Sequence, residues 1–133
     1  MTDLSTTRLA TIGQIAIPVK DLARAVAFYR DQLGMRFLFE APPALAFFDC
    51  GGVRLMLDVP EDKEFANHSS VLYYKVRDID AAFRDLQSAG VTFRREPHLI
   101  AKLPDHELWM AFFDDTEGNT LALMDEKKAK GLG

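Results

Sequence analysis

One local pattern occurs twice in this chain, and the duplication is what most limits its possible folds. The segment 19–22 (Val-Lys-Asp-Leu) and the amphipathic run up to Gly34 recur as segment 76–79 (Val-Arg-Asp-Ile) and the run up to Gly90. An apolar, strand-like stretch precedes each copy. Self-similarity at a fixed spacing indicates one supersecondary unit used twice around a shared core. We therefore expect two equivalent units that enclose a site between them.

Each copy has the pattern of a strand, a helix and three further strands. Asp21 and Asp78 are carboxylates suited to helix N-caps, and Gly34 and Gly90 stand where left-handed C′ residues belong. Alternating or continuous apolar runs between Gly and Pro turn signals predict the strands. The predicted strands cover 12–19, 35–40, 44–50 and 53–59 in the first copy, and 71–76, 92–95, 107–114 and 120–125 in the second.

This element order predicts an α+β fold in a single domain over residues 11–126. Its two units span about 12–59 and 70–125, and flexible tails are expected at 1–10 and 127–133. The second copy carries about ten extra residues, at 97–107, in one strand connection, which is longer than usual. Because such insertions often carry binding groups, we expect this segment, with His98 and His106, to form a lid.

Composition excludes several function classes. The formal charge of −4 is spread over 133 residues without an acidic or basic block, so we expect neither nucleic acid nor a membrane as a partner. No signal peptide or membrane span is recognisable, which favours a cytoplasmic location. Cys50 has no second cysteine to pair with, and we expect it to be a buried, unreactive thiol.

The duplicated segments resemble a known superfamily. The stretch I-G-Q-I-A-I-P-V-K-D-L-A-R-A-V-A-F-Y-R-D-Q-L-G-M from residue 12, V-R-D-I-D-A-A-F-R-D-L-Q-S-A-G-V from residue 76 and D-D-T-E-G-N-T-L-A-L-M-D from residue 114 are similar to the vicinal oxygen chelate superfamily. This superfamily includes glyoxalase I, bleomycin resistance proteins and extradiol dioxygenases. The resemblance implies two βαβββ units that pair into a cup-shaped mixed sheet with the active site in the cup, and it implies a homodimer.

The resemblance also identifies four positions where metal-using members carry His, Gln or Glu ligands. These positions hold Gln14, Met56, Val71 and Ala122. A divalent ion needs imidazole nitrogens and carboxylate oxygens, whereas this set offers one amide and one thioether. Shifting each strand by one residue brings in no better donors. We therefore predict no metal at this site and no other cofactor.

Two alternatives remain open at this stage. A displaced metal site would have to use His68, His98 or His106, but no pair of these histidines has a spacing typical of metal ligands. Alternatively, His106 is a candidate general base, because Asp105 and Glu107 flank it and imidazole groups in general exchange protons near neutral pH.

The register implied by the resemblance predicts a mainly apolar cup with a few polar groups, as is typical of small-molecule sites. Arg54 either pairs with Asp58 or binds an anionic ligand group. Strand alternation allows either Trp109, Ala111 and Phe113 or Leu108, Met110 and Phe112 to face the cup. The predicted ligand-binding residues are Gln14, Arg54, Met56, Tyr73, His98, His106 and Trp109.

The leading hypothesis is metal-independent binding of a small apolar or aromatic molecule, as in the bleomycin resistance proteins. The alternative is a glyoxalase-like lyase, isomerase or dioxygenase that uses a displaced metal or His106 as a base. A third hypothesis is an interaction module without a ligand. The sequence does not decide whether a reaction is catalysed or which molecule is bound.

Overall fold

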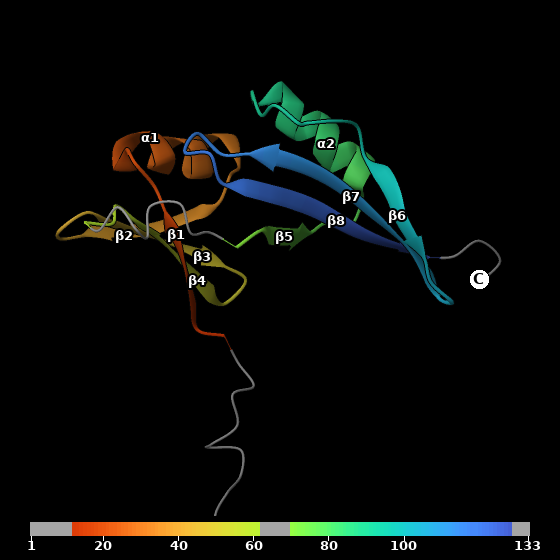
Figure 1. Cartoon of the computed structure of the whole chain (residues 1–133), viewed down its shortest axis with the longest axis horizontal. Helices are drawn as coiled ribbons and strands as arrows, with labels where there is room; N and C mark the ends of the chain where they lie inside the picture. Colours follow the sequence, from red (N-terminus) through yellow and green to blue (C-terminus); the bar gives the residue numbers. More distant parts are fainter. Residues whose placement is uncertain (1–11, 62–69, 129–133) are drawn as a thin grey trace, which may run out of the picture.

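A computed structural model describes residues 12–61 and 70–128, which form the expected two βαβββ units (Figure 1). The first unit comprises β1 (Gln14–Pro18), α1 (Leu22–Ala27), the π-helix η2 (Phe28–Gln32), β2 (Arg36–Ala41), β3 (Leu45–Cys50) and β4 (Val53–Asp58). The second comprises β5 (Leu72–Lys75), α2 (Ile79–Ser88), β6 (His98–Lys102), β7 (His106–Asp114) and β8 (Thr120–Lys128). The α+β fold of paired βαβββ units is thus confirmed.

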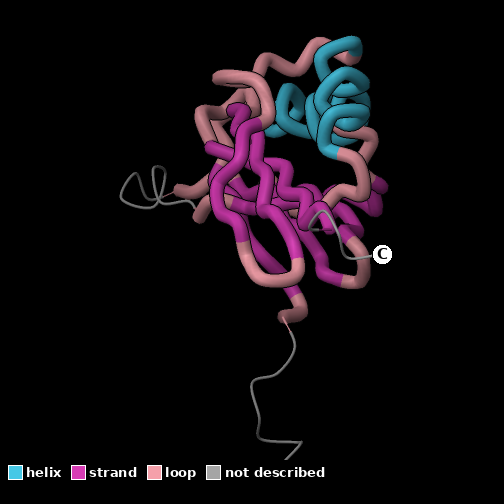
Figure 2. Tube along the Cα trace, turned by 90° about the vertical axis from the view of Figure 1, so that its right-hand side faces the viewer, coloured by secondary structure: helices cyan, strands magenta, loops and turns pink. Residues whose placement is uncertain are grey.

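Each unit contributes one four-stranded mixed sheet, and the two sheets have the same topology. The strand order is β1-β4-β3-β2 in the first sheet, here called sheet A, and β5-β8-β7-β6 in the second, here called sheet B. The first strand of each unit pairs in parallel with the last one. The helices lie on one side of the strands in two perpendicular views (Figures 1 and 2). We call the opposite side of each sheet its open face.

Strand alternation places apolar residues under the helices, as the sequence predicts. On β1, Ile17 is 1% exposed and belongs to the core, whereas Gln14 and Ala16 are exposed on the open face. On β4, Leu55 and Leu57 are buried in the same core. The period of two therefore fixes which residues are available for a site on the open face.

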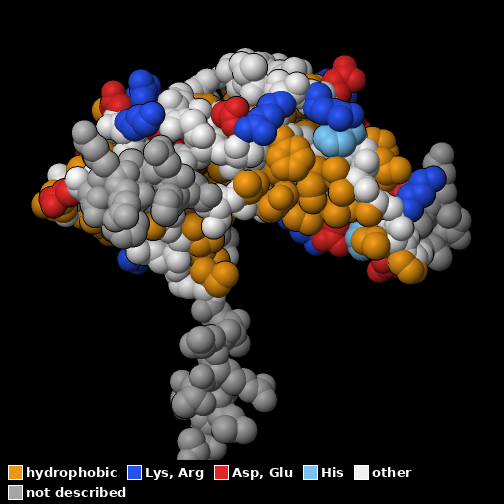
Figure 3. Space-filling view, in the orientation of Figure 1, with side chains coloured by type: hydrophobic (Ala, Val, Ile, Leu, Met, Phe, Trp, Pro, Cys, Tyr) orange, Lys and Arg blue, Asp and Glu red, His pale blue; other side chains and the backbone are white. Residues whose placement is uncertain are grey.

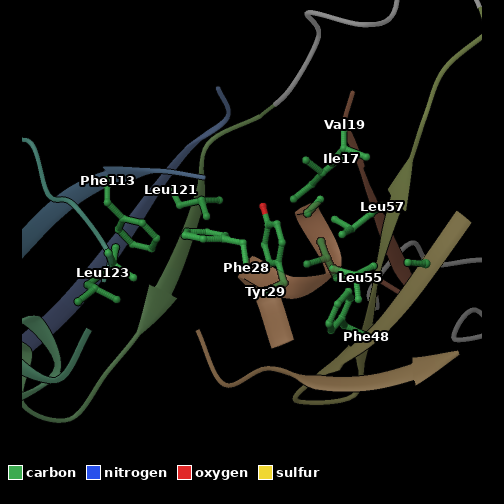
Figure 4. Close-up of a cluster of buried hydrophobic side chains, with 14 of the residues drawn as sticks. Ile17, Val19, Phe28, Tyr29, Phe48, Leu55, Leu57, Phe113, Leu121 and Leu123 are labelled. Atoms are coloured by element: carbon green, nitrogen blue, oxygen red, sulfur yellow. The ribbon is translucent and has the colours of Figure 1, made fainter. Parts of the chain in front are cut away.

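The core is continuous between the two units, and the π-helix η2 lies in its middle. Two consecutive residues of η2, Phe28 and Tyr29, are buried, and their rings contact edge to face with centroids 5.6 Å apart. Figure 4 shows them between Leu55 and Leu57 of sheet A and Leu121 of sheet B. One hydrophobic core therefore holds both sheets in place.

The predicted helix caps are confirmed. Asp21 accepts a hydrogen bond from the backbone N–H of Arg24, and Asp78 accepts one from Ala81. Gly90, just after α2, has φ +98°, a conformation that favours glycine. None of the helices in the described ranges is long and apolar enough to cross a membrane.

The inserted segment 97–107 is not the lid we predicted. It forms β6 and the first residues of β7, which pair as an antiparallel hairpin with an irregularity between Leu99 and Ala101. The strand predicted over 92–95 is also wrong, since only Phe93 forms an isolated bridge there, to Phe113. The inserted residues form the edge strand here because β7 is long enough to pair with them on one side and with β8 on the other.

The chain ends need one correction. β8 continues to Lys128, two residues into the segment that we predicted as a C-terminal tail. The predicted N-terminal tail, at residues 1–10, and His68 lie outside the described residues.

Candidate functional site

The open face of sheet B carries three of the seven predicted binding residues, Tyr73, His98 and His106. The strand register places Tyr73 opposite Ala122, Phe112 opposite the same alanine, and Met110 opposite both Met124 and His98. On β7 the residues of this face are thus Leu108, Met110 and Phe112. Ala111 and Phe113, at 0% and 1% exposed, lie on the helix side. In the space-filling view, hydrophobic and histidine side chains gather over sheet B (Figure 3).

Phe112 is the centre of an aromatic group on this face. Its ring centroid lies 6.2 Å from that of Tyr73, in an edge-to-face arrangement, and 6.4 Å from that of His98. Tyr73 is 48% exposed, which is unusual for a large aromatic residue on a strand. An accessible apolar surface with aromatic rings and a few polar atoms is typical of sites for small organic molecules.

A polar cluster lies at one end of the same face. The Nδ1 atom of His106 is 2.8 Å from Asp105 Oδ1, and its Nε2 atom is 3.4 Å from Glu126 Oε2. Lys75 Nζ lies 3.2 Å from the other oxygen of Glu126. The hydrogen bond with His106 lowers the pKa of Asp105. Nδ1 of His106 is hydrogen-bonded to Asp105, and Nε2 has the Glu126 carboxylate as a neighbour, so His106 is part of a charged cluster at this end of the face.

Trp109 lies on the opposite side of the sheet from these residues. Its indole N–H donates to Glu107 Oε1 at 3.2 Å, and Lys127 Nζ lies 4.7 Å from the centroid of its ring. Lys127 also forms an ion pair with Asp80 of α2. The structure therefore brings Tyr73, His98 and His106 to one face and separates Trp109 from them.

The other predicted residues lie on the open face of sheet A. Gln14 Nε2 is 3.7 Å from Met56 Sδ, so these two predicted neighbours are in contact. The Arg54 guanidinium lies 5.6 Å from the ring centroid of Phe47. Phe47 contacts Phe39 with centroids 4.8 Å apart. Arg54 thus stacks on an aromatic ring, and no ion pair between it and Asp58 occurs in the described structure.

The superfamily metal positions do not fit a divalent ion in this chain. Gln14 and Met56 offer an amide and a thioether that already contact each other, Val71 is a hydrocarbon side chain, and Ala122 is fully buried without a donor. Within residues 12–61 and 70–128, no group of three His, Cys, Asp or Glu residues is arranged to hold a metal ion. The chemistry of these donors therefore gives no basis for a metal-dependent step.

The turn between β7 and β8 holds a polar network that sequence reasoning missed. Glu117 accepts hydrogen bonds from the backbone N–H groups of Lys20 and Asp21, each at 2.8 Å, and from the Arg24 guanidinium at 2.7 Å. Burial alone would raise the pKa of Glu117, but these hydrogen bonds and one from Thr116 outweigh it and lower the pKa to about 2. The network joins the two units, and its carboxylate Glu117 is held by donors from the start of α1.

One signal in the sequence did point to this network. When the two copies are aligned on Gly52 and Gly118, Asp49 matches Asp115, but Glu117 matches a glycine. A charged residue that occurs in only one of two equivalent turns indicates a contact made by that turn alone. Here the contact is to the start of α1 in the other unit.

The fold defines a class: proteins built from two paired βαβββ units, each of which leaves one face of its sheet free of helices. The chain belongs to the Glyoxalase/Bleomycin resistance protein/Dioxygenase superfamily, whose family model matches residues 11–123. The uncharacterized protein YraH of Bacillus subtilis (strain 168) is 29% identical, with 83% of this chain and 94% of that protein covered.

Solved structures of other proteins share the fold. A lactoylglutathione lyase from Agrobacterium tumefaciens has a TM-score of 0.72 at 21% identity, covering 89% of this chain and 95% of its own. TnmS3, an antibiotic binding protein from Streptomyces sp. CB03234, has a TM-score of 0.69 at 21% identity, covering 90% and 98%. At these identities the similarity establishes the fold, and the activity has to be argued from the site.

Proposed function

We propose that this protein binds a small, mainly apolar or aromatic molecule on the open face of sheet B, without a metal ion or another cofactor. The observation that carries the proposal is the aromatic group of Tyr73, Phe112 and His98. These rings are accessible on the open face and are not part of the buried core. Met110 and Met124 extend this apolar surface with flexible side chains that adapt to a ligand's shape.

The donor set favours binding over a lyase-type reaction. The relatives include both a lactoylglutathione lyase and an antibiotic binding protein, so the family alone does not choose between them. A metal-assisted reaction needs hard ligands at the positions of Gln14, Met56, Val71 and Ala122, which these residues do not supply. Sequestration of an aromatic compound requires only the apolar face and its polar end.

The proposed site keeps most of the predicted residues and exchanges one. Tyr73, His98 and His106 remain, with Phe112 taking the place of Trp109. Gln14, Arg54 and Met56 line the corresponding face of sheet A and complete the site when a second copy covers sheet B. A homodimer in the cytoplasm is therefore part of the proposal, and its test follows in the Discussion.

Fluorescence titration with N-phenyl-1-naphthylamine, a neutral aromatic probe, tests the binding proposal. We expect saturable enhancement that is the same with and without a chelator of divalent ions. Phe112→Ala removes the central ring of the site and should weaken probe binding by about tenfold, a typical effect of losing a buried aromatic contact.

Trp109→Phe is the matched control, because Trp109 lies on the same strand but on the other face. We expect it to leave the affinity for the probe unchanged. Loss of binding on chelation would contradict the metal-free proposal. An equal loss of affinity in Phe112→Ala and Trp109→Phe, with both variants folded, would contradict the assignment to the open face.

A further inference from the structure

The open face of sheet A carries an arginine that has no acidic partner among the residues that the structure describes. Arg54 of β4 is exposed, and its guanidinium lies 5.6 Å from the ring centroid of Phe47. The alternative of an ion pair with Asp58 is not realised, because four positions along an extended strand separate the two residues by roughly 13 Å. No ion pair within the described ranges involves Arg54, so its charge is available to a bound anion.

The strand register places Arg54 in a row of polar residues that crosses sheet A. From β1 to β2, this row holds Gln14, Arg54, Asp49 and Arg36. Arg36 likewise forms no ion pair with a described residue, and Asp49 accepts a hydrogen bond from the backbone N–H of Gly52. The two arginines are two strand spacings apart, roughly 10 Å, which two long side chains can bridge around one small anion. Two arginines and one aspartate leave a single net positive charge in the row.

The next row along the same strands is apolar and partly accessible. It holds Ala16, Met56, Phe47 and Phe39. Phe47 is only 8% exposed, because the Phe39 ring, with its centroid 4.8 Å away, and the Arg54 guanidinium cover it. Phe39 itself is 46% exposed, and Met56 is partly accessible. An apolar group placed on Phe39 and Met56 would therefore lie beside the guanidinium.

The contact with Phe47 suits Arg54 to the recognition of a carboxylate. A guanidinium that rests on an aromatic ring keeps N–H groups free at its edge, and its planar fork matches the two oxygens of a carboxylate. Asp49 lies directly across from Arg54 on β3, so a group with two negative charges would meet more repulsion than a carboxylate. The two rows together favour a monoanion that is joined to an apolar body.

We propose that the molecule bound by this protein is an apolar or aromatic carboxylic acid. Its carboxylate accepts hydrogen bonds from Arg54, with Arg36 adding positive charge, and its apolar part lies on Phe39 and Met56. This inference rests on the proposed function, since sheet A supplies the second wall of that site. It adds the charged group by which the molecule is recognised.

Isothermal titration calorimetry with 2-naphthoate and with 2-naphthamide tests this inference. The two probes have nearly the same shape, but the amide is neutral. We expect the wild-type protein to bind the acid at least about fivefold more tightly than the amide, as hydrogen bonds from a charged donor provide. Arg54→Met removes the charge and keeps a long, unbranched side chain, so the two probes should then bind equally. Arg54→Gln serves the same purpose should the methionine variant not fold.

Arg84→Met is the matched control, because Arg84 is exposed on α2, on the helix side of the molecule. It should keep the preference for the acid. The inference is overturned when the wild-type protein binds the acid no more tightly than the amide, when a folded Arg54 variant keeps the full preference, or when Arg84→Met loses it equally.

The neutral probe separates this inference from the proposed function. Binding of N-phenyl-1-naphthylamine to a protein that does not prefer the acid would support the proposed function and overturn the inference. A preference for the acid that depends on Arg54, in a protein that does not bind N-phenyl-1-naphthylamine, would support the inference and contradict binding on the open face of sheet B.

Discussion

At the scale of single residues, the carboxylate of Glu117 holds the two units together. Its side chain is 0% exposed, and its donors come from Lys20, Asp21 and Arg24 at the start of α1. Charge-assisted hydrogen bonds and the positive end of a helix both favour the ionised form of a carboxylate. The junction of the units therefore depends on the charge of one side chain, and acid should weaken it.

Glu117→Gln tests this dependence on charge. The pKa of Glu117 falls from 4.5 to about 2 on folding, so its ionised form stabilises the native state above pH 4.5, and this contribution disappears as the pH falls toward 2. We expect the substitution to lower the free energy of unfolding at pH 7 by on the order of 3 kcal/mol, measured by urea denaturation.

The difference between wild type and Glu117→Gln should shrink toward zero between pH 4.5 and pH 2. Glu96→Gln is a suitable control, because Glu96 is an exposed carboxylate whose side chain makes no ion pair or hydrogen bond with the described residues. A loss of stability that stays constant over this pH range would show that the shape of the side chain matters and its charge does not.

At the scale of secondary structure, the start of α2 is fixed to sheet B by two carboxylates. Asp78 caps the helix locally by accepting from the backbone N–H of Ala81. Asp125 of β8, only 5% exposed, accepts from the backbone N–H of Ile79 at 3.0 Å. The second bond ties the helix to the sheet, so the position of α2 on sheet B is set by contacts between elements.

Asp78→Ala should lower the free energy of unfolding by about 1 kcal/mol, since it removes one N-cap hydrogen bond while Asp125 still holds the helix. Asp80→Ala is the matched control in the same turn. Asp80 is exposed and, among the described residues, pairs with Lys127 alone, so its loss should cost less than about 0.5 kcal/mol. Chemical denaturation of both variants provides the comparison, and equal losses would contradict the capping role of Asp78.

Local signals in the sequence predicted most elements correctly. Alternation on β1 and β4 and the capping carboxylates Asp21 and Asp78 depend on residues close together in the chain, so the sequence reveals them. β6 was misplaced because 92–95 and 98–102 are both plausible strands by their composition. The choice between these two segments depends on pairing with β7, which includes an irregularity between Leu99 and Ala101.

The candidate site was less predictable, because it depends on register and on contacts between the units. A period of two on β7 allows either Trp109 or Phe112 on the open face. Because the side that holds Trp109 packs against the core under the helices, Phe112 is the residue on the open face. The bond from Lys20 to Glu117 joins residues 97 positions apart. The buried hydroxyl of Tyr74, which has no hydrogen-bond partner among the described residues, likewise depends on how the units pack, and the strand pattern does not reveal it.

At the scale of the whole molecule, helices cover one side of both sheets (Figures 1 and 2), and large apolar residues are accessible on the other side. On the open faces, Phe39 is 46% exposed, Val71 39% and Tyr73 48%. Accessible apolar surface of this kind marks either a binding site or an interface between proteins. A second copy seated on these faces would cover part of the surface and deepen the remainder into a cup.

Sedimentation velocity tests this arrangement. We expect the wild-type protein at micromolar concentration to sediment with twice its chain mass of 15.0 kDa. Tyr73→Lys places a charge on the open face and should shift the population toward monomer, because an unpaired charge is costly in an apolar interface. Ala23→Lys adds the same charge to the exposed side of α1 and should leave the dimer intact. A wild-type monomer at all concentrations, or equal dissociation of both variants, would contradict dimerisation through the open faces.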